Sequence, residues 1–157
     1  MTAQKITPFL WFETDVREAV KHYLKVFGEN AKIEDESRLD DTPSGSVEIF
    51  NISIFGQEFT LMGAGPYKTF NESISFVISC ETQEEVDYYW NGLSAVPESE
   101  QCGWCKDKFG VSWQVVPTAL GRLMGDPNRE KAGKVQEAMM KMKKLVIKDL
   151  EDAFNQA

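Results

Sequence analysis

"CGWCKDKFGVSWQVVP", residues 102–117, is the stretch that decides the fold. It opens with Cys102 and Cys105 in C-x-x-C spacing, passes through Gly110 and ends in β-branched and aromatic residues. The cysteine spacing is typical of a thioredoxin-type redox site or of half a zinc site. The residues around it are typical of a strand, a turn and a second strand.

A redox site of the thioredoxin type needs its first cysteine at the N-terminus of a helix, which stabilises the thiolate. No helix is expected after Cys105, because Gly110 follows and the chain then becomes β-branched. If residues 102–106 form a strand, the Cα atoms of Cys102 and Cys105 lie roughly 10 Å apart, beyond the roughly 7 Å that a disulfide spans. We therefore expect two reduced thiols that act as small apolar residues.

A structural zinc site is not expected either, since it needs four nitrogen or sulfur ligands. The chain has three cysteines and one histidine, and Cys80 and His22 belong to other predicted elements. So few cysteines are typical of the reducing cytoplasm, which is the expected location. The sequence shows neither a signal-peptide pattern nor a run of membrane-spanning length.

The charge balance argues against two classes of partner. The chain of 157 residues has a net charge of −8 and a pI near 4.7. A nucleic-acid binder is expected to carry a basic face, and an anionic membrane would repel this surface. We expect no nucleic-acid partner and no membrane partner.

The strand-turn-strand stretch has a counterpart earlier in the chain. Residues 47–65 predict two strands joined by a tight turn at Phe55-Gly56-Gln57. A shift of 54 residues places Phe59 on Trp113, and a shift of 67 places Tyr23 on Trp90. Each half predicts a strand, a helix and about three strands. The prediction is a single domain, 1–157, with an internal repeat over 6–65 and 73–117 and a C-terminal helical segment over 118–157.

Three local predictions complete this outline. Asp15 is expected to cap the first helix together with Glu18. Residues 32–46 predict the start of a strand followed by a polar loop. The C-terminal segment carries an amphipathic face, which is expected to pack against the core or against another subunit. The alternative is that this face is a methionine-lined ligand surface. It is formed by Val135, Met139, Met142, Val146, Leu150 and Ala153.

Several motifs together resemble the PhnB-like branch of the vicinal-oxygen-chelate superfamily. They are "ITPFLWFE" (6–13), "EAVKHYLKVFG" (18–28), "ISFVISCETQEEVDYYWNGLS" (74–94), "CGW" (102–104) with "DKFGVSWQVVP" (107–117), and "KVQEAMMKMKKLVIKDLEDAF" (134–154). The superfamily includes glyoxalases, bleomycin-resistance proteins and dioxygenases. This branch also carries the name 3-demethylubiquinone-9 3-methyltransferase.

The resemblance implies an α+β fold in which two βαβββ modules form a cup-shaped half-barrel, here with added C-terminal helices. It also implies a homodimer, sometimes with modules exchanged between subunits. Metal-dependent members hold a divalent ion with a His, Glu or Gln from each of four strands. The matching positions here are Pro8, Thr60, Ser75 and Gln114, of which Gln114 alone is a plausible ligand. The expectation is a protein without metal or other cofactor, and no acid–base pair that would identify catalytic residues is found.

The methyltransferase name is not supported by a nucleotide-binding motif. "MGAGPY" (62–67) contains G-x-G after a predicted strand, but Pro66 and the aromatic residues after it do not begin a helix, as such a motif requires. This stretch is better interpreted as a linker, and methyl transfer is not expected.

Strand alternation predicts which side chains line the cup. The inward set is apolar with a few neutral hydrogen-bonding groups: Leu10, Phe12, Thr60, Met62, Ser75, Val77, Ser79, Gln114 and Val116. The opposite set is expected to pack under the helices: Phe9, Trp11, Phe59, Phe76, Ile78 and Trp113. Such a lining suits a small apolar or neutral molecule.

The leading hypothesis is a metal-free, dimeric binding protein that encloses this molecule, oriented by Gln114 and Thr60. The first alternative is a metal-dependent lyase, isomerase or dioxygenase of the same superfamily. The others are a cup without a ligand and a protein whose role is assembly through its C-terminal helices. Whether the chain is an enzyme stays open.

Overall fold

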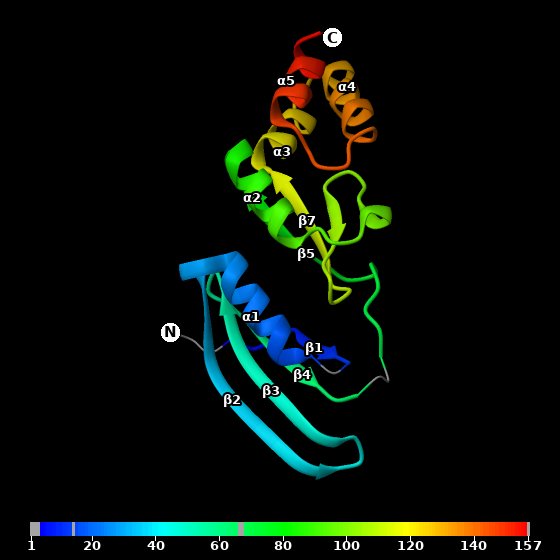
Figure 1. Ribbon diagram of the computed structural model, residues 1–157. Helices are drawn as coiled ribbons and strands as arrows, with labels where there is room; N and C mark the ends of the chain where they lie inside the picture. Colours follow the sequence, from blue (N-terminus) through cyan, green and yellow to red (C-terminus); the bar gives the residue numbers. More distant parts are fainter. Residues whose placement is uncertain (1–3, 14, 66–67, 157) are drawn as a thin grey trace. The chain divides into compact units, whose positions relative to one another are not determined.

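The computed structural model describes residues 4–13, 15–65 and 68–156 (Figure 1). Contacts divide the chain into two compact units, the first ending at Thr69 and the second beginning at Phe70. The first unit contains β1 (Phe9–Phe12), α1 (Val16–Phe27), a 3-10 turn (Gly28–Asn30), β2 (Ala31–Thr42), β3 (Gly45–Ile54) and β4 (Gln57–Gly63). The second contains β5 (Ser75–Cys80), α2 (Gln83–Leu93), a 3-10 turn (Pro97–Ser99), β6 (Trp104–Lys106), β7 (Ser112–Pro117), α3 (Thr118–Met124), α4 (Arg129–Met139) and α5 (Ile147–Asn155).

The first unit is a four-stranded sheet covered on one face by α1. The strand order is β1-β4-β3-β2, with β1 parallel to β4 and the other pairs antiparallel. Apolar residues at helical spacing along α1, Ala19 and Tyr23 among them, are buried, and so are Phe50 and Leu61 on the sheet. This packing leaves the opposite face of the sheet open.

The predicted capping of α1 is only half right. Asp15 occupies the N-cap position, but its side chain makes no capping hydrogen bond to any described residue. Glu18 instead forms an ion pair of 2.7 Å with Lys21. The side-chain cap occurs in the second unit, where the Thr82 hydroxyl accepts a hydrogen bond of 3.2 Å from the Glu85 N–H.

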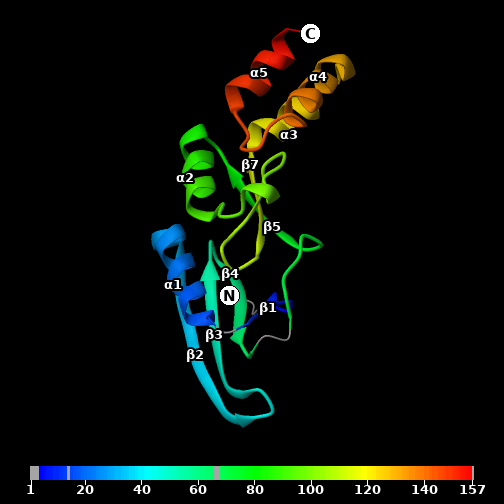
Figure 2. The same cartoon turned by 45° about the vertical axis from the view of Figure 1, so that its right-hand side comes forward.

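The strand start predicted in residues 32–46 is confirmed, but most of the polar loop predicted after it is wrong. Residues Ala31–Thr42 form a continuous strand, β2, that pairs with β3 from Ala31 opposite Ile54 to Thr42 opposite Gly45. Figures 1 and 2 show this pair as a long curved ribbon. Because nearly every residue of β2 is exposed, its sequence lacks the alternation that marks a half-buried strand.

The second unit has a smaller sheet, with order β5-β7-β6, in which β5 is parallel to β7 and β6 antiparallel to it. Trp90 and Leu93 of α2 and Val115 of β7 are buried. Three strands were expected after the helix, but described residues 83–117 contain two. The α+β class predicted from the sequence is confirmed, with two open sheets and C-terminal helices.

The C-terminal helices α3, α4 and α5 lie together (Figure 1). They share a small core around Leu123, Val135 and Leu150. The predicted face is interrupted, because α4 ends at Met139 and α5 begins at Ile147. The intervening segment has its own partners in the second unit. The Gln83 side chain accepts a hydrogen bond of 2.8 Å from the Ile147 N–H and donates one of 3.2 Å to the Leu145 carbonyl.

Across residues 4–13, 15–65 and 68–156, none of the helices combines the length and the hydrophobicity that crossing a membrane would require.

Candidate functional site

The C-x-x-C stretch forms a tight turn leading into β6. Gln101 and Trp104 exchange backbone hydrogen bonds of 3.1 and 2.8 Å, and Cys102 and Gly103 have φ values of 51° and 87°. Cys102 therefore lies in a turn, which corrects the expected strand over 102–106. The prediction that no helix starts after Cys105 is confirmed across residues 106–117, which are all described.

The three cysteines are unbridged and differ in environment. Cys80 and Cys105 are buried, and burial raises the pKa of Cys80 to about 11 and that of Cys105 to about 12. Cys102 is half-buried, and its Sγ lies 3.1 Å from Gln101 Nε2 and 3.8 Å from Met140 Sδ. A buried thiol with a raised pKa is a poor nucleophile, so the pair does not have the character of a redox site.

Asp107 organises the turn between β6 and β7. Its carboxylate accepts hydrogen bonds of 2.9 and 3.0 Å from the N–H groups of Phe109 and Val111, and one of 2.9 Å from Trp113 Nε1. The residue is completely buried. These contacts fix the start of β7 and therefore the position of Gln114.

The open face of the second sheet carries two rows of side chains across β6, β7 and β5. In one row Trp104 lies opposite Gln114, which lies opposite Val77. In the other, Lys106 lies opposite Ser112, which lies opposite Ser75. Residues paired in register point to the same face of a sheet.

Four of the sequence-predicted site residues in this unit share that face with Gln114. The Gln114 amide donates a hydrogen bond of 2.9 Å to the Ser75 hydroxyl, and Val77 is 57% exposed. Ser79 lies opposite Val116. On the other face, Phe76 and Trp113 are in ring contact at 5.5 Å, and Trp113 is buried.

The first sheet has a comparable open face. Phe9, Thr60 and Asn51 form one row, and the Thr60 hydroxyl donates a hydrogen bond of 2.8 Å to Asn51 Oδ1. Trp11 lies opposite Met62 in the next row. Asn51 was missed by the sequence analysis, although an asparagine inside the apolar run "VEIFNISIF" was a signal.

The prediction that Leu10 and Phe12 line the cup is wrong. Leu10 lies opposite Leu61, and Phe12 is buried against Tyr23 of α1, with ring centroids 6.4 Å apart. Both therefore share the helix-covered face. Phe9 and Trp11, which were expected under the helix, share the open face with Thr60 and Met62.

The wrong faces were assigned because the connection between strand and helix is one residue longer in the first unit than in the second. β1 ends three residues before the N-cap Asp15, whereas β5 ends two residues before the N-cap Thr82. A shift of 67 residues that aligns the helices therefore misaligns the first strands by one position. That one step moves every side chain of the strand to the other face.

The four strand positions that hold the metal in metal-dependent members do not offer the donors of a divalent-metal site here. Pro8 lies outside β1, and its backbone carbonyl accepts a hydrogen bond of 2.9 Å from the Thr60 N–H. At the four positions of the sequence analysis, Thr60, Ser75 and Gln114 supply neutral oxygens, and the first two oxygens already have partners. Within the described part of the chain, no group of three His, Cys, Asp or Glu side chains is placed to hold a metal. The residues present do not fit the metal of the metal-dependent relatives.

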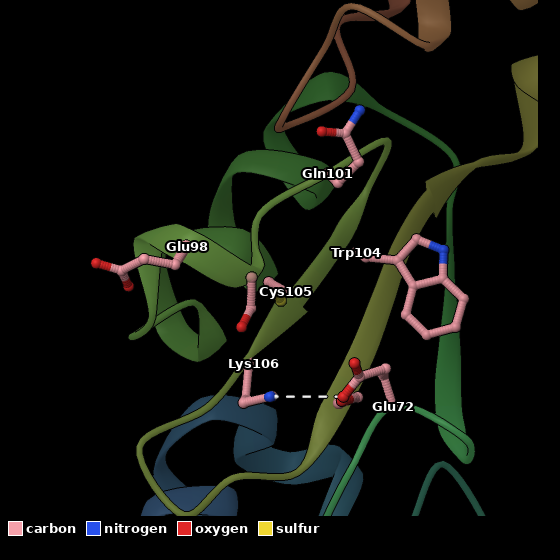
Figure 3. A pocket seen from close by; sticks show the side chains of 8 residues that line it. Glu72, Glu98, Gln101, Trp104, Cys105 and Lys106 are labelled. Carbon is pink, nitrogen blue, oxygen red and sulfur yellow. Dashed lines mark ion pairs between the residues drawn. The ribbon is translucent and has the colours of Figure 1, made fainter.

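A pocket of about 360 Å³ lies beside β6 in the second unit (Figure 3). Its lining includes Glu72, Glu98, Gln101, Trp104, Lys106 and Ser112. Lys106 forms an ion pair of 3.7 Å with Glu72. In Figure 3 the Trp104 indole lies on the opposite side of β6 from the Glu98 carboxylate, which points away from the other labelled side chains. Trp104 and Lys106 were not predicted as site residues, because a three-residue strand gives no periodic signal.

The G-x-G stretch does not form a nucleotide-binding turn in its described part. β4 ends at Gly63, and no helix follows in residues 64–65 or 68–74. Pro66 and Tyr67, on which part of the prediction rested, lie outside the described residues. This geometry supplies no helix N-terminus for a cofactor phosphate.

Comparisons with known proteins agree with this architecture. Residues 4–116 match the family described as 3-demethylubiquinone-9 3-methyltransferase. The PhnB protein from Bacillus cereus is similar at 32% sequence identity with a TM-score of 0.60, over 73% of this chain and 100% of that one. The fosfomycin resistance protein FosX from Listeria monocytogenes is similar at 17% sequence identity with a TM-score of 0.51. This match covers 78% of the present chain and 97% of the FosX chain.

The comparison with curated proteins gives no match. The FosX similarity concerns the fold alone, whereas the PhnB similarity and the family match extend to sequence. The fold expected from the motifs, that of the glyoxalase and bleomycin-resistance proteins, is therefore confirmed. The chain belongs to the PhnB-like family named 3-demethylubiquinone-9 3-methyltransferase, within the vicinal-oxygen-chelate superfamily.

Proposed function

We propose that this chain binds a small, largely apolar or neutral molecule on the open faces of its sheets, without a metal ion. Binding and orientation of the molecule are the activity. The Gln114 amide is the orienting group on the second sheet, and the Thr60 hydroxyl is the orienting group on the first. The protein acts as a homodimer. The observation that carries the proposal is the neutral hydrogen-bonding group at the centre of each open face.

On the second sheet, Gln114 is half-buried and joined to Ser75, and exposed Val77 lies beside it in register. On the first sheet, Thr60 is joined to Asn51, and Phe9 beside it is 56% exposed. Apolar surface next to a few fixed polar groups is the usual composition of a small-molecule site. The hydrogen bonds preorganise the polar groups, which reduces the cost of ordering them when a ligand binds.

The absence of suitable metal ligands at these positions supports binding rather than Lewis-acid chemistry. Threonine, serine and glutamine side chains are weak ligands for a divalent ion without carboxylate or imidazole partners. A metal-dependent lyase or dioxygenase would need ligands from elsewhere in the chain.

The first test is native mass spectrometry of protein purified without chelator or affinity tag, with elemental analysis of the same sample. The expected result is a dimer without stoichiometric divalent metal that retains or takes up a small organic molecule. A stoichiometric metal that is needed for turnover would refute the proposal and favour the metal-dependent enzyme.

A further inference from the structure

We propose that Lys106 is an anion subsite, which receives a carboxylate of the ligand in place of Glu72 while Trp104 contacts the ligand's flat apolar part. This inference rests on the proposed function and narrows its ligand class. The ligand would be an arene or a similar flat body that carries one acidic group. All the residues of this subsite belong to the second unit.

Lys106 is a partly buried cation with a loosely held partner. Its side chain is 25% exposed, whereas the side chain of Glu72 is 73% exposed. The ion pair between them is 3.7 Å long, well beyond the roughly 2.7–2.9 Å of a charge-assisted hydrogen bond. A partly buried ammonium needs a counter-charge, and an ion pair of this length with an exposed carboxylate contributes little to stability. A better-placed carboxylate would therefore displace Glu72.

Trp104 provides the apolar part of the subsite. It is two residues before Lys106 on β6, so the two side chains share the open face and their Cα atoms lie roughly 6–7 Å apart. In Figure 3 the indole lies along the sheet, and the Lys106 ammonium points to Glu72 on the same side. Two neighbouring side chains on one face, one aromatic and one cationic, can contact the two parts of a single small ligand that joins an aromatic ring to a carboxylate. Gln114, opposite Trp104 in register, can bond a second polar group of the ligand.

The other charged group of the pocket does not occupy this position. Glu98 lines the pocket from the turn Pro97–Ser99, but its carboxylate points away from Lys106 and Trp104 (Figure 3). The Gln101 amide is bonded to the Met140 carbonyl at 3.0 Å. Glu72 is thus the carboxylate that competes with a ligand for Lys106, and Glu84, which is exposed on α2 outside the pocket lining, is a control carboxylate.

The experiment compares benzoate with its neutral isostere benzamide as probes of the full chain, by saturation-transfer NMR and calorimetric titration. Wild-type protein is expected to prefer benzoate at low salt. Glu72→Gln should raise benzoate affinity about 2- to 5-fold, the range expected when an exposed competing ion pair is removed, and leave benzamide affinity unchanged. Lys106→Met should abolish the preference, Lys106→Arg should retain it, and the control variant Glu84→Gln should behave as wild type.

Equal affinity for the two probes in the wild type, or a Glu72→Gln variant with an unchanged affinity ratio, would overturn the anion subsite. If benzamide still binds and depends on Gln114, the proposed function survives that result. If neither probe binds, the anion subsite is overturned, and the proposed function is decided by the mass-spectrometry test. Thermal unfolding of each variant establishes that it is folded, and Lys106→Arg provides the second test should Lys106→Met unfold.

Discussion

The Gln114 amide on β7 donates a hydrogen bond of 2.9 Å to the Ser75 hydroxyl on β5. The two residues are 39 positions apart, and the parallel pairing of β5 with β7 brings them to one face of the sheet. Because Ser75 holds the amide, the Gln114 carbonyl oxygen and the second amide hydrogen remain as fixed groups for a ligand. This pair is therefore the centre of the site proposed in the second unit.

Gln114→Ala is predicted to weaken ligand binding by about 1–2 kcal/mol, the net contribution of one or two hydrogen bonds. The measurement is calorimetric titration with the molecule found by native mass spectrometry, or with benzamide. The matched control is Gln57→Ala, because Gln57 is exposed at the start of β4. Equal affinities of wild type and Gln114→Ala would remove Gln114 from the site.

Asp107→Asn is predicted to lower the free energy of unfolding by about 2–3 kcal/mol, because it turns a buried acceptor into a donor. The carboxylate oxygen that now accepts from Trp113 Nε1 at 2.9 Å would become an amide N–H₂ facing the indole N–H. Urea unfolding followed by circular dichroism measures the change.

Asp35→Asn is the control for this variant, since Asp35 is exposed on β2 and should change stability by less than about 0.5 kcal/mol. If Asp107→Asn unfolds at the same urea concentration as the wild type, the carboxylate does not anchor the turn.

Much of the fold could be predicted because its signals are local. The spacing of the apolar residues Tyr23 and Phe27 indicates α1. The glycine Gly110 indicates the turn between the two strands of a hairpin. β2 could not be predicted in full, because it is held by backbone pairing with β3 and buries almost no side chain. The break between α4 and α5 was missed for a related reason, since residues of the second unit, Gln83 among them, satisfy the backbone of the intervening segment.

The side chains that share a face could be predicted where one register applied. Ser75, Val77 and Gln114 share a face because β5 and β7 follow the assumed alternation. On β1 the longer connection to α1 shifted the register, so Leu10 and Phe12 were assigned to the wrong face. Such an insertion is not visible when two helices and two strands are aligned by a single offset.

Gly103→Ala is predicted to destabilise the second unit more than Gly45→Ala destabilises the first. Both glycines have positive φ, 87° and 81°, so both substitutions carry similar backbone strain. A Cβ at Gly103 would lie 2.9 Å from Leu145 Cδ1 and 3.1 Å from the Val115 carbonyl, whereas one at Gly45 would meet nothing within 4 Å. The extra cost should be about 1–3 kcal/mol, the usual range for overpacking.

Urea unfolding of the two glycine variants provides the comparison. Equal losses would mean that the segment between α4 and α5 does not pack on the turn at Gly103. A larger loss for Gly103→Ala would establish that close approach in solution.

Thiol labelling is predicted to distinguish Cys102 from the two buried cysteines. At pH 8 one thiol of the folded protein should react readily with Ellman's reagent, because Cys80 and Cys105 are buried and have raised pKa values. Cys102→Ser should abolish this fast reaction. Fast reaction of the Cys102→Ser variant would show that a second thiol is accessible.

The same two thiols predict a loss of stability at high pH. In the folded chain the pKa is about 11 for Cys80 and about 12 for Cys105, against 9.0 for an unperturbed thiol. The unfolded chain therefore loses these protons first, so their contribution to stability is complete below pH 9 and falls as the pH rises towards 11 and 12.

Urea unfolding of wild type and of the variant Cys80→Ala with Cys105→Ala, at pH 7.5 and pH 10, isolates this effect from other titrating groups. The wild type should lose more stability between the two pH values than the variant, whatever the variant's stability at pH 7.5. An equal loss in both proteins would mean that the two thiols titrate normally, and that the helix-facing side of the second sheet is open to solvent at these positions.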